Sequence, residues 1–251
     1  MSIDMTDYAR NYASHYTADI DLERILVKYR REQVLNSLVK FPHSSILETG
    51  CGMEPFFCCD IDFSRYTVIE PCTEFVTHAE KCSNGDSRIS ILNGFFESIT
   101  SDLMINYPFD FIIVSSLLHE VPDPKVFLKS LRKNCTDQTV VHLNVPNVYS
   151  FHRLLAVAMG LIGSIYEKSA TENRFGRHSH FDRNSLVNLC EHHGFSIISS
   201  RTYFIKPFTH QQLEYLLKTG FMTEQMIEGL SRLSSSFPEH GCEICLEMRP
   251  V

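Results

Sequence analysis

SSILETGCGMEPFF, residues 44–57, is the stretch that decides the fold, because it passes from an apolar run into a glycine turn. The run SSILET predicts a short buried strand. Gly50 and Gly52 let the backbone turn sharply, and the helix that would follow offers unpaired N–H groups to a negatively polarised or adenosine-type ligand. A third small residue usually completes such a turn, and Glu54 stands there instead. The turn predicts a cofactor loop only if the rest of the chain supports it.

Strands and helices alternate on both sides of this turn. Apolar runs predict further strands at residues 66–71, 88–94, 109–118 and 138–146, and helical spacing predicts helices at 21–41, 72–82 and 123–135. Strands that are apolar on both faces and alternate with amphipathic helices indicate a parallel sheet covered by helices on both sides.

The C-terminal part follows a different pattern. Residues 147–182 contain one apolar helix followed by the polar run ENRFGRHSHFD. A helix at 183–195, a strand at 196–205 and two short helices precede a final strand at 242–248. This order suggests that the last strand enters one edge of the sheet in the antiparallel direction.

Composition restricts the class of protein. The 251 residues are 43% hydrophobic and carry a formal net charge of −7, which suits one elaborated domain and disfavours a nucleic-acid partner. The nine cysteines follow no disulfide framework, the chain starts with polar sequence, and the longest apolar run, 154–165, is too short to span a membrane. We therefore expect reduced thiols, a cytoplasmic location and no membrane partner. We keep a homodimer as an alternative to a monomer.

An acid at the end of the second strand supports the cofactor interpretation. Glu70 lies about 20 residues after the glycine turn, where a carboxylate can accept hydrogen bonds from both ribose hydroxyls of a bound nucleotide. The turn and Glu70 together predict a site for an adenosine-containing cofactor.

Five segments carry a resemblance to a known family. ILETGCGMEPF, YTVIEP, ISILNGFFESI, FDFIIVSSLLHEVPDP and TVVHLNVPN occur in an order and spacing that resemble class I S-adenosylmethionine-dependent methyltransferases, over roughly residues 40 to 200. The segment VPNVYSFHRLLAVAMGLI, with HSHFD and LCEHHGF after it, resembles the subgroup of ubiquinone-biosynthesis-type and sugar or surface-glycan methyltransferases.

The resemblance implies a fold and its organisation. We expect an α/β, Rossmann-like, doubly wound sheet of seven strands, mostly parallel with an antiparallel last strand. Residues 1–251 would form one domain, with an N-terminal helical cap (1–42), a cofactor-binding half (43–146), an acceptor lid (147–182) and a C-terminal completion of the sheet (183–251).

The resemblance also implies a set of cofactor-binding residues. Glu48 would face the methionine amino group, and Gly50 and Gly52 would pass beneath the cofactor while Glu54 points away from it. Phe95 stands where many relatives have an aspartate, so we expect packing and a backbone contact on adenine, with Glu97 supplying the acid. The implied set is Glu48, Gly50, Cys51, Gly52, Glu70, Pro71, Gly94, Phe95, Phe96, Ser115 and Ser116.

The catalytic prediction depends on the acceptor. A hydroxyl acceptor, such as that of a sugar or sugar-nucleotide, needs a base, and His119 follows the fourth strand with Glu120 beside it. The alternative for His119 is a helix-start residue bonded to backbone, and for Glu120 a solvent-facing carboxylate. An N-methyltransferase of a small amine, or a protein that binds the cofactor without catalysis, are the rival functions.

The small-molecule acceptor would contact the N-terminal segment and the inserted lid. Arginines there suit an acidic acceptor group. His142, within the fifth strand, is interpreted as a buried and hydrogen-bonded core histidine. No metal is expected, because Cys242 and Cys245 lack a second ligand pair. The predicted acceptor-binding residues are Tyr12, Tyr16, Asn147, His152, Arg153, Arg177, His178 and His180.

Overall fold

A seven-stranded sheet forms the centre of the molecule. The structure, a computed structural model, describes residues 21–99, 108–168 and 179–251. The strand order is β3-β2-β1-β4-β5-β7-β6, in which β7 runs antiparallel to both of its neighbours and the pairs from β3 to β5 are parallel. The strands are β1 (Ser45–Thr49), β2 (Arg65–Glu70), β3 (Ile89–Asn93), β4 (Phe111–Ser115), β5 (Val140–Pro146), β6 (Phe195–Tyr203) and β7 (Glu243–Pro250). The predicted Rossmann-like, doubly wound fold is confirmed.

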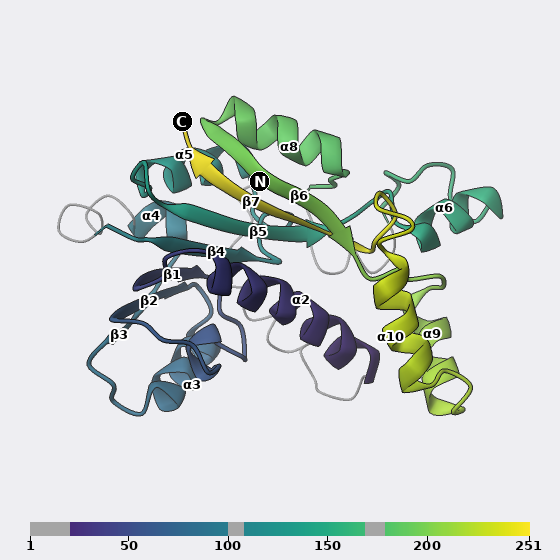
Figure 1. Ribbon diagram of the computed structural model, residues 1–251, viewed down its shortest axis with the longest axis horizontal. Coiled ribbons are helices and arrows are strands. Elements are labelled where there is room, and N and C mark those ends of the chain that lie inside the picture. The colour runs from purple at the N-terminus through teal and green to yellow at the C-terminus, as the bar shows by residue number, and fades with distance from the viewer. Residues whose placement is uncertain (1–20, 100–107, 169–178) are drawn as a thin grey trace.

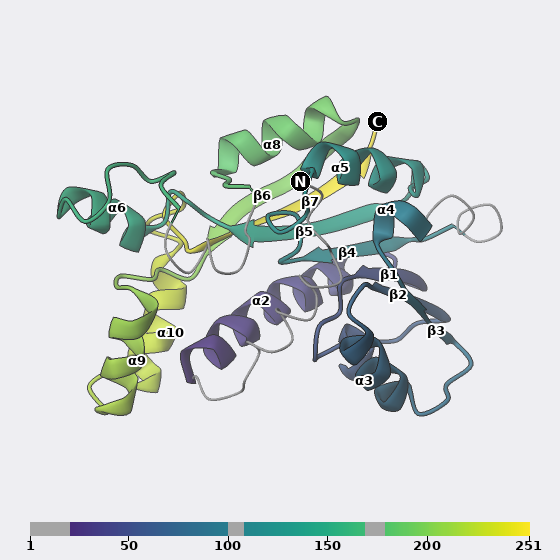
Figure 2. The same ribbon diagram turned by 180° about the vertical axis from the view of Figure 1, so that it is seen from behind.

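Helices cover both faces of the sheet (Figures 1 and 2). One face carries α2 (Asp21–Lys40) and α3 (Thr73–Ser83), and the other carries α4 (Phe96–Ile99), α5 (Pro124–Lys133) and α8 (Arg183–His192). The remaining helices are η1 (Phe56–Cys58, a 3-10 turn), α6 (Phe151–Ala158), α9 (His210–Lys218) and α10 (Glu224–Leu233).

The buried strands explain why two layers of helices form. Along β4, Ile112 and Val114 belong to one core cluster and Phe111 and Ile113 to the other, because successive side chains point to opposite faces. Each face therefore buries its own apolar set against helices, and neither face of the strand tolerates water.

The fourth strand is shorter than its apolar pattern predicts. The prediction spans residues 109–118, whereas β4 ends at Ser115. Ser116 has a φ of 55°, a left-handed conformation that no extended strand contains. The chain turns there toward the carboxyl ends of the strands.

Three helices lie beyond those carboxyl ends (Figure 1). Helices α9 and α10 pack against the start of α2 in a third apolar cluster, which includes Leu22, Leu26, Phe204 and Leu213. Helix α6 projects from the sheet and buries none of its residues. No helix in the described ranges is long and apolar enough to cross a membrane.

Gly241→Ala is expected to destabilise the fold by about 1–3 kcal/mol or more. A Cβ at Gly241 would lie 2.4 Å from the backbone N of Tyr203 and 2.6 Å from its carbonyl O, and this paired backbone cannot move aside. Gly229→Ala in α10 is the matched control, because nothing lies within 4 Å of the added Cβ and helical alanine stabilises by about 0.5–1 kcal/mol. Urea unfolding should give opposite signs for the two variants; equal midpoints would contradict the packing at Gly241.

Candidate functional site

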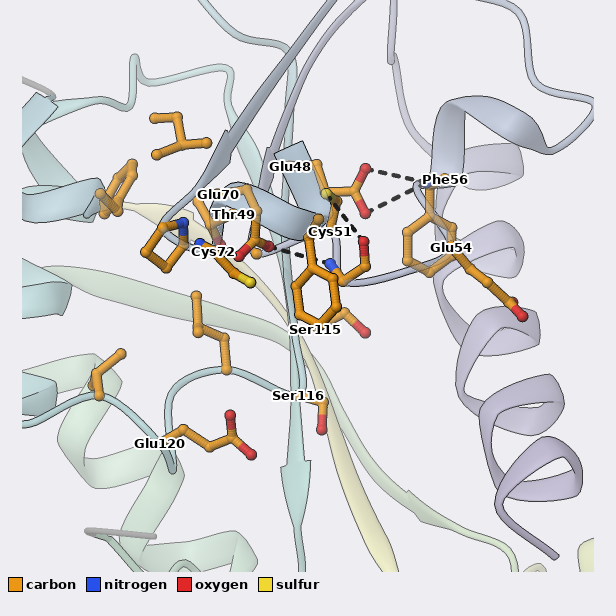
Figure 3. Close-up of a pocket in the computed structure, with 18 of the residues that line it drawn as sticks. Glu48, Thr49, Cys51, Glu54, Phe56, Glu70, Cys72, Ser115, Ser116 and Glu120 are labelled. Atoms are coloured by element: carbon orange, nitrogen blue, oxygen red, sulfur yellow. Dashed lines mark hydrogen bonds between the residues drawn. The ribbon is translucent and has the colours of Figure 1, made fainter. Parts of the chain in front are cut away.

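A cavity of about 190 Å³ lies at the carboxyl ends of β1, β2 and β4 (Figure 3). The chain adds β2 and β3 on one side of β1 and then returns to place β4 on the other side. Ligands of open α/β sheets bind at such a switch point. The cavity therefore occupies the position that the fold itself favours for a ligand.

The glycine turn forms the floor of this cavity. Gly50 and Gly52 both line it, with φ angles of 73° and 56°, which residues with a Cβ rarely adopt. Gly50 N donates to Ile69 O at 2.8 Å, so the turn starts directly from the paired strands β1 and β2. The backbone conformation, rather than lack of space, requires glycine at Gly52, since an added Cβ would meet nothing within 4 Å.

Glu70 joins the turn to the end of β2. Its side chain is 4% exposed, and its carboxylate accepts hydrogen bonds from Gly52 N at 3.2 Å and Cys72 N at 2.9 Å. Burial raises the pKa of Glu70, and the two backbone N–H bonds act in the opposite direction. The carboxylate retains acceptor sites, because a carboxylate can accept about four hydrogen bonds, so it fits a ligand with two adjacent hydroxyls.

Glu48 lines the cavity, but its carboxylate holds the protein together. Its Oε2 accepts from the Tyr66 hydroxyl at 2.6 Å and from Phe56 N at 3.1 Å, which fixes η1 above β1 (Figure 3). The group is 1% exposed, and burial raises the pKa of Glu48 to about 7. The predicted contact with a methionine amino group stays a prediction.

Glu48→Gln is expected to remove a pH dependence of stability. The folded protein keeps a proton on Glu48 up to a pKa of about 7, whereas the unfolded chain releases it near 4.5. The wild type should therefore lose stability relative to the variant as the pH rises from about 5 to 7, by on the order of 1 kcal/mol per pH unit, and no further above this range.

Urea unfolding of both proteins at several pH values tests this. His142, with its pKa lowered by burial to about 3, contributes the opposite pH dependence. Both proteins keep His142, so the difference between their stabilities isolates Glu48. A difference that stays constant across this pH range would contradict the assignment.

One face of α2 forms a wall of the cavity. The sequence predicted an N-terminal helical cap over the site but singled out none of the residues on this face. Glu23, Val27, Arg30 and Arg31 follow helical spacing and all line the cavity. In the sequence these residues form a polar stripe beside the apolar stripe of the same helix. No local pattern indicated which part of the protein the polar stripe would face.

Arg31 of α2 contacts Glu54, the residue at the third position of the turn. Its guanidinium lies 4.4 Å from the centre of the Phe56 ring, bonds the carbonyl of Glu54 and lies 3.8 Å from Glu54 Oε2. The Glu54 side chain is 60% exposed and extends toward α2 at the rim of the cavity (Figure 3). Glu54 thus fastens the turn to the N-terminal helix.

Arg30 forms a buried ion pair with Glu243 of β7. Its Nε lies 3.1 Å from both carboxylate oxygens and its Nη2 lies 2.5 Å from Oε1, while the Tyr203 hydroxyl donates to Oε2. Although burial opposes ionisation, the charge and hydrogen bonds of Arg30 hold the pKa of Glu243 below its usual value. The pair connects the cavity wall on α2 to the inserted strand.

Aromatic side chains lie at the adenine end of the predicted site. Phe95 and Phe96 line the cavity with Pro71, and Glu97 stands beside them with a pKa raised by burial. Gly94, with a φ of 153°, connects β3 to this segment and does not itself line the cavity. The structure brings the other ten predicted cofactor residues to the cavity lining.

Of the two predicted catalytic residues, Glu120 lines the cavity and His119 does not. The His119 side chain is buried, at 2% exposure, and its Nε2 lies 3.5 Å from Glu120 Oε1. His119 therefore stands behind Glu120, and any role in catalysis would pass through that carboxylate.

The residues predicted to bind the acceptor are placed elsewhere or not described. Asn147 donates to the carbonyls of Glu239 and Gly241 at 2.9 and 2.8 Å, and Arg153 Nε donates to the carbonyl of Ile165 at 2.8 Å. Neither they nor His152 and His180 line the cavity. Tyr12, Tyr16, Arg177 and His178 lie outside the described residues. Within the described ranges no group of three or more potential ligands could hold a metal ion.

Comparison with known proteins agrees with this geometry. A family model described as a methyltransferase domain matches residues 22–200. No curated protein matches the chain significantly.

The solved structures that share the fold include three methyltransferases. The N-methyltransferase NodS from Bradyrhizobium japonicum WM9, in complex with S-adenosyl-L-homocysteine, has 14% identity and a TM-score of 0.61, with 98% of this chain and 97% of that chain covered. A methyltransferase from Thermotoga maritima, described as a possible histamine N-methyltransferase, has 15% identity and a TM-score of 0.59, with coverages of 96% and 99%. An S-adenosylmethionine-dependent methyltransferase from Mesorhizobium loti has 13% identity and a TM-score of 0.56, with coverages of 88% and 97%.

Proposed function

This chain belongs to the methyltransferase-domain family, and from that premise we propose that its cavity holds S-adenosylmethionine beside a small polar acceptor. It is an S-adenosylmethionine-dependent methyltransferase with the class I fold. The observation that carries the site assignment is the contact of Glu70 with the left-handed turn at Gly52. The resemblance to the ubiquinone-biosynthesis-type and glycan subgroup stays a prediction.

The residues present fit this cofactor. Glu70 would accept from the ribose hydroxyls, the turn at Gly50 and Gly52 would allow close approach, and Phe95 with Phe96 would pack on adenine. When bound, the cofactor supplies an electrophilic methyl group on its sulfonium. The protein's part is to place the acceptor in line and to take a proton from it.

The acceptor that the lining favours is a small amine. Among the described lining residues there are six glutamates and two arginines, and both arginines already contact carboxylates, Arg30 at Glu243 and Arg31 at Glu54. Glu48 keeps its proton up to a pKa of about 7, but the other carboxyl groups still outnumber the guanidinium groups. A lining with this excess favours a cationic ligand over a phosphate. Glu120, 8% exposed at the cavity wall, would bind the ammonium form of the acceptor. Its carboxylate would then take a proton from the ammonium, and the resulting free amine would attack the methyl group.

A hydroxyl acceptor, such as that of a sugar or sugar-nucleotide, is the second candidate. The observation that favours it is the contact between His119 and Glu120. A hydroxyl is a weaker base than an amine and depends more on a proton acceptor, and a carboxylate backed by an imidazole can serve as one.

Calorimetry with S-adenosylmethionine, followed by product detection on matched panels of small amines and sugar hydroxyls, tests the proposal. We expect binding, and methylation within the amine panel. Glu120→Gln should lower kcat/KM by about 100-fold or more, whereas Glu54→Gln at the rim should change it less than tenfold. Methylation of sugar hydroxyls alone would replace the amine assignment with the second candidate. Absence of cofactor binding would overturn the whole proposal.

A further inference from the structure

A chain of buried polar side chains runs from Glu247 of β7 to the cavity wall. His142 and Asn144 lie two residues apart on β5, on the same face, and Ser37 of α2 covers them. All three are 0% exposed, and none lines the cavity. The prediction that His142 is a buried, hydrogen-bonded core histidine is confirmed. In addition, the hydrogen bonds of this network fix which atom donates and which accepts at each step, and packing alone would not require that.

The order of donors and acceptors can be assigned by starting from Ser116. The backbone N–H of Ser116 donates to Asn144 Oδ1 at 2.8 Å, and because an N–H can only donate, the amide of Asn144 must present its oxygen there. Asn144 Nδ2 therefore faces His142 Nε2, at 3.2 Å. An amide NH₂ can only donate, so His142 Nε2 must accept, and the ring proton must be on Nδ1.

The rest of the chain follows from this tautomer. His142 Nδ1–H donates to Ser37 Oγ at 2.9 Å, and the Ser37 hydroxyl donates to Glu247 Oε1 at 2.6 Å. Glu247 is held in turn by Ser199 and Arg201 of β6 and lies 3.6 Å from Lys40 of α2. The Ser37 hydroxyl also lies 3.1 Å from the carbonyl of Gln33, but its shorter contact is the one to Glu247. Every donor of the network has an acceptor, which is how buried polar networks fix a single geometry.

The cavity end of the chain holds a strained residue. Ser116 lines the cavity and has a φ of 55°, a conformation that costs a residue with a Cβ on the order of 1 kcal/mol. Its N–H is shared between the carbonyl and the side-chain oxygen of Asn144, and Asn144 Nδ2 also donates to Ser115 Oγ at 3.2 Å. Asn144 is therefore the group that keeps Ser115 and Ser116 in place.

We propose that Asn144, oriented by His142, is a positioning residue that sets the Ser115–Ser116 segment against the bound cofactor. The inference rests on the proposed function, because it assigns these two serines to the cofactor wall. Burial keeps His142 neutral, with its pKa lowered to about 3, so the arrangement of donors and acceptors does not change over the working pH range.

Two substitutions of His142 separate positioning from packing. His142→Gln keeps an acceptor for Asn144 and a donor for Ser37, whereas His142→Leu fills the space with no polar group. We expect the affinity for S-adenosylhomocysteine, measured by calorimetry, to stay within about threefold of wild type in His142→Gln and to fall at least tenfold in His142→Leu, since a tenfold loss corresponds to about one hydrogen bond. Equal affinities in the two variants would overturn the proposal.

Asn144→Asp provides a second readout. The carboxylate still accepts from Ser116 N–H, but it can no longer donate to His142, and it favours a protonated ring. The other groups that face this ring are Glu247 and Cys245 of β7, Arg201 of β6 and Lys40 of α2. We expect the KM for S-adenosylmethionine to rise more steeply with pH in this variant than in the wild type. The His142 ring protons should titrate in NMR spectra of the variant but not in those of the wild type.

Asn147→Asp is the matched control. Asn147 is also buried, at 2% exposure, but bonds the 239–241 loop rather than Ser116. It should lower stability without a pH-dependent KM. The same pH profile in both aspartate variants would refute a specific role for Asn144. Failure of the wild type to bind S-adenosylhomocysteine would overturn the proposed function and this inference together, whereas wild-type binding with unaltered variants would overturn this inference alone.

Discussion

Glu70→Ala is expected to weaken binding of S-adenosylhomocysteine by at least about 100-fold. A hydrogen bond to a charged group contributes about 1.5–3 kcal/mol, and the variant loses those to two ribose hydroxyls. It also leaves the N–H groups of Gly52 and Cys72 without their carboxylate acceptor, which loosens the turn itself. Both effects act in the same direction on affinity.

The two effects can be separated with a 2′-deoxy analogue of the ligand. In the wild type the analogue should bind more weakly than S-adenosylhomocysteine, because one hydroxyl is missing. In Glu70→Ala the two ligands should bind equally, since the acceptor of that hydroxyl is gone. Comparing both ligands on both proteins, as in a double-mutant cycle, gives the free energy of the contact between Glu70 and the ribose hydroxyl. Glu54→Ala, at the rim of the cavity, should lose less than tenfold. A variant that still discriminates between the two ligands would place the ribose elsewhere.

Glu243→Gln is expected to destabilise the folded protein by about 1.5–3 kcal/mol, the contribution of hydrogen bonds to a charged group. The substitution removes the carboxylate that bonds Arg30, but the Arg30 side chain is 18% exposed and Glu23 lies 3.9 Å away, so the cost stays below that of a fully buried charge without a partner. The double variant Arg30→Met with Glu243→Leu removes both charges and should recover most of the loss. Urea unfolding of the single and double variants measures this, and a single-variant effect under about 1 kcal/mol would contradict a buried pair.

The same pair predicts a pH dependence. The folded-state pKa of Glu243 is lowered, so its contribution to stability is present above the unfolded value of 4.5 and is lost as the pH falls through the lower folded value. Glu243→Gln should not show this acid-induced loss. Because Arg30 lines the cavity, the variant should also weaken ligand binding under conditions in which it remains folded.

Local patterns predicted the alternation of strands and helices, the glycine turn and Glu70, while the family resemblance supplied the other residues predicted to bind the cofactor. Gly50, Gly52 and Glu70 are readable because backbone conformation and strand position constrain them within a few residues of sequence. A parallel sheet covered on both faces follows from the alternation of apolar strands and helices. The seven-stranded arrangement was implied by the family resemblance, and the structure shows its strand order.

Contacts between distant residues could not be predicted in the same way. Arg30 contacts Glu243, which lies 213 residues away in the sequence, and Ser37 contacts His142, which lies 105 residues away. Nothing in the sequence near one residue of such a pair identifies the other. In the segment 147–182, Asn147 and Arg153 carry suitable chemistry but bond nearby carbonyls and do not line the cavity, so their predicted contact with an acceptor stays a prediction. Residue type indicates what a side chain can bind, while only the packing decides whether it reaches the cavity.

The position of β7 between β5 and β6 has a consequence for folding during synthesis. Every other element of the sheet precedes β7 in the sequence, so the ribosome delivers β5 and β6 before the strand that joins them. Until then the edge of β5 is an unpaired template that can pair with another chain. Arg30 and Ser37 also lack their hydrogen-bond acceptors until β7 is in place, because β7 supplies Glu243 to Arg30 and Glu247 to Ser37. The nascent protein therefore passes through a period of exposure to aggregation and chaperone binding that ends only when β7 inserts.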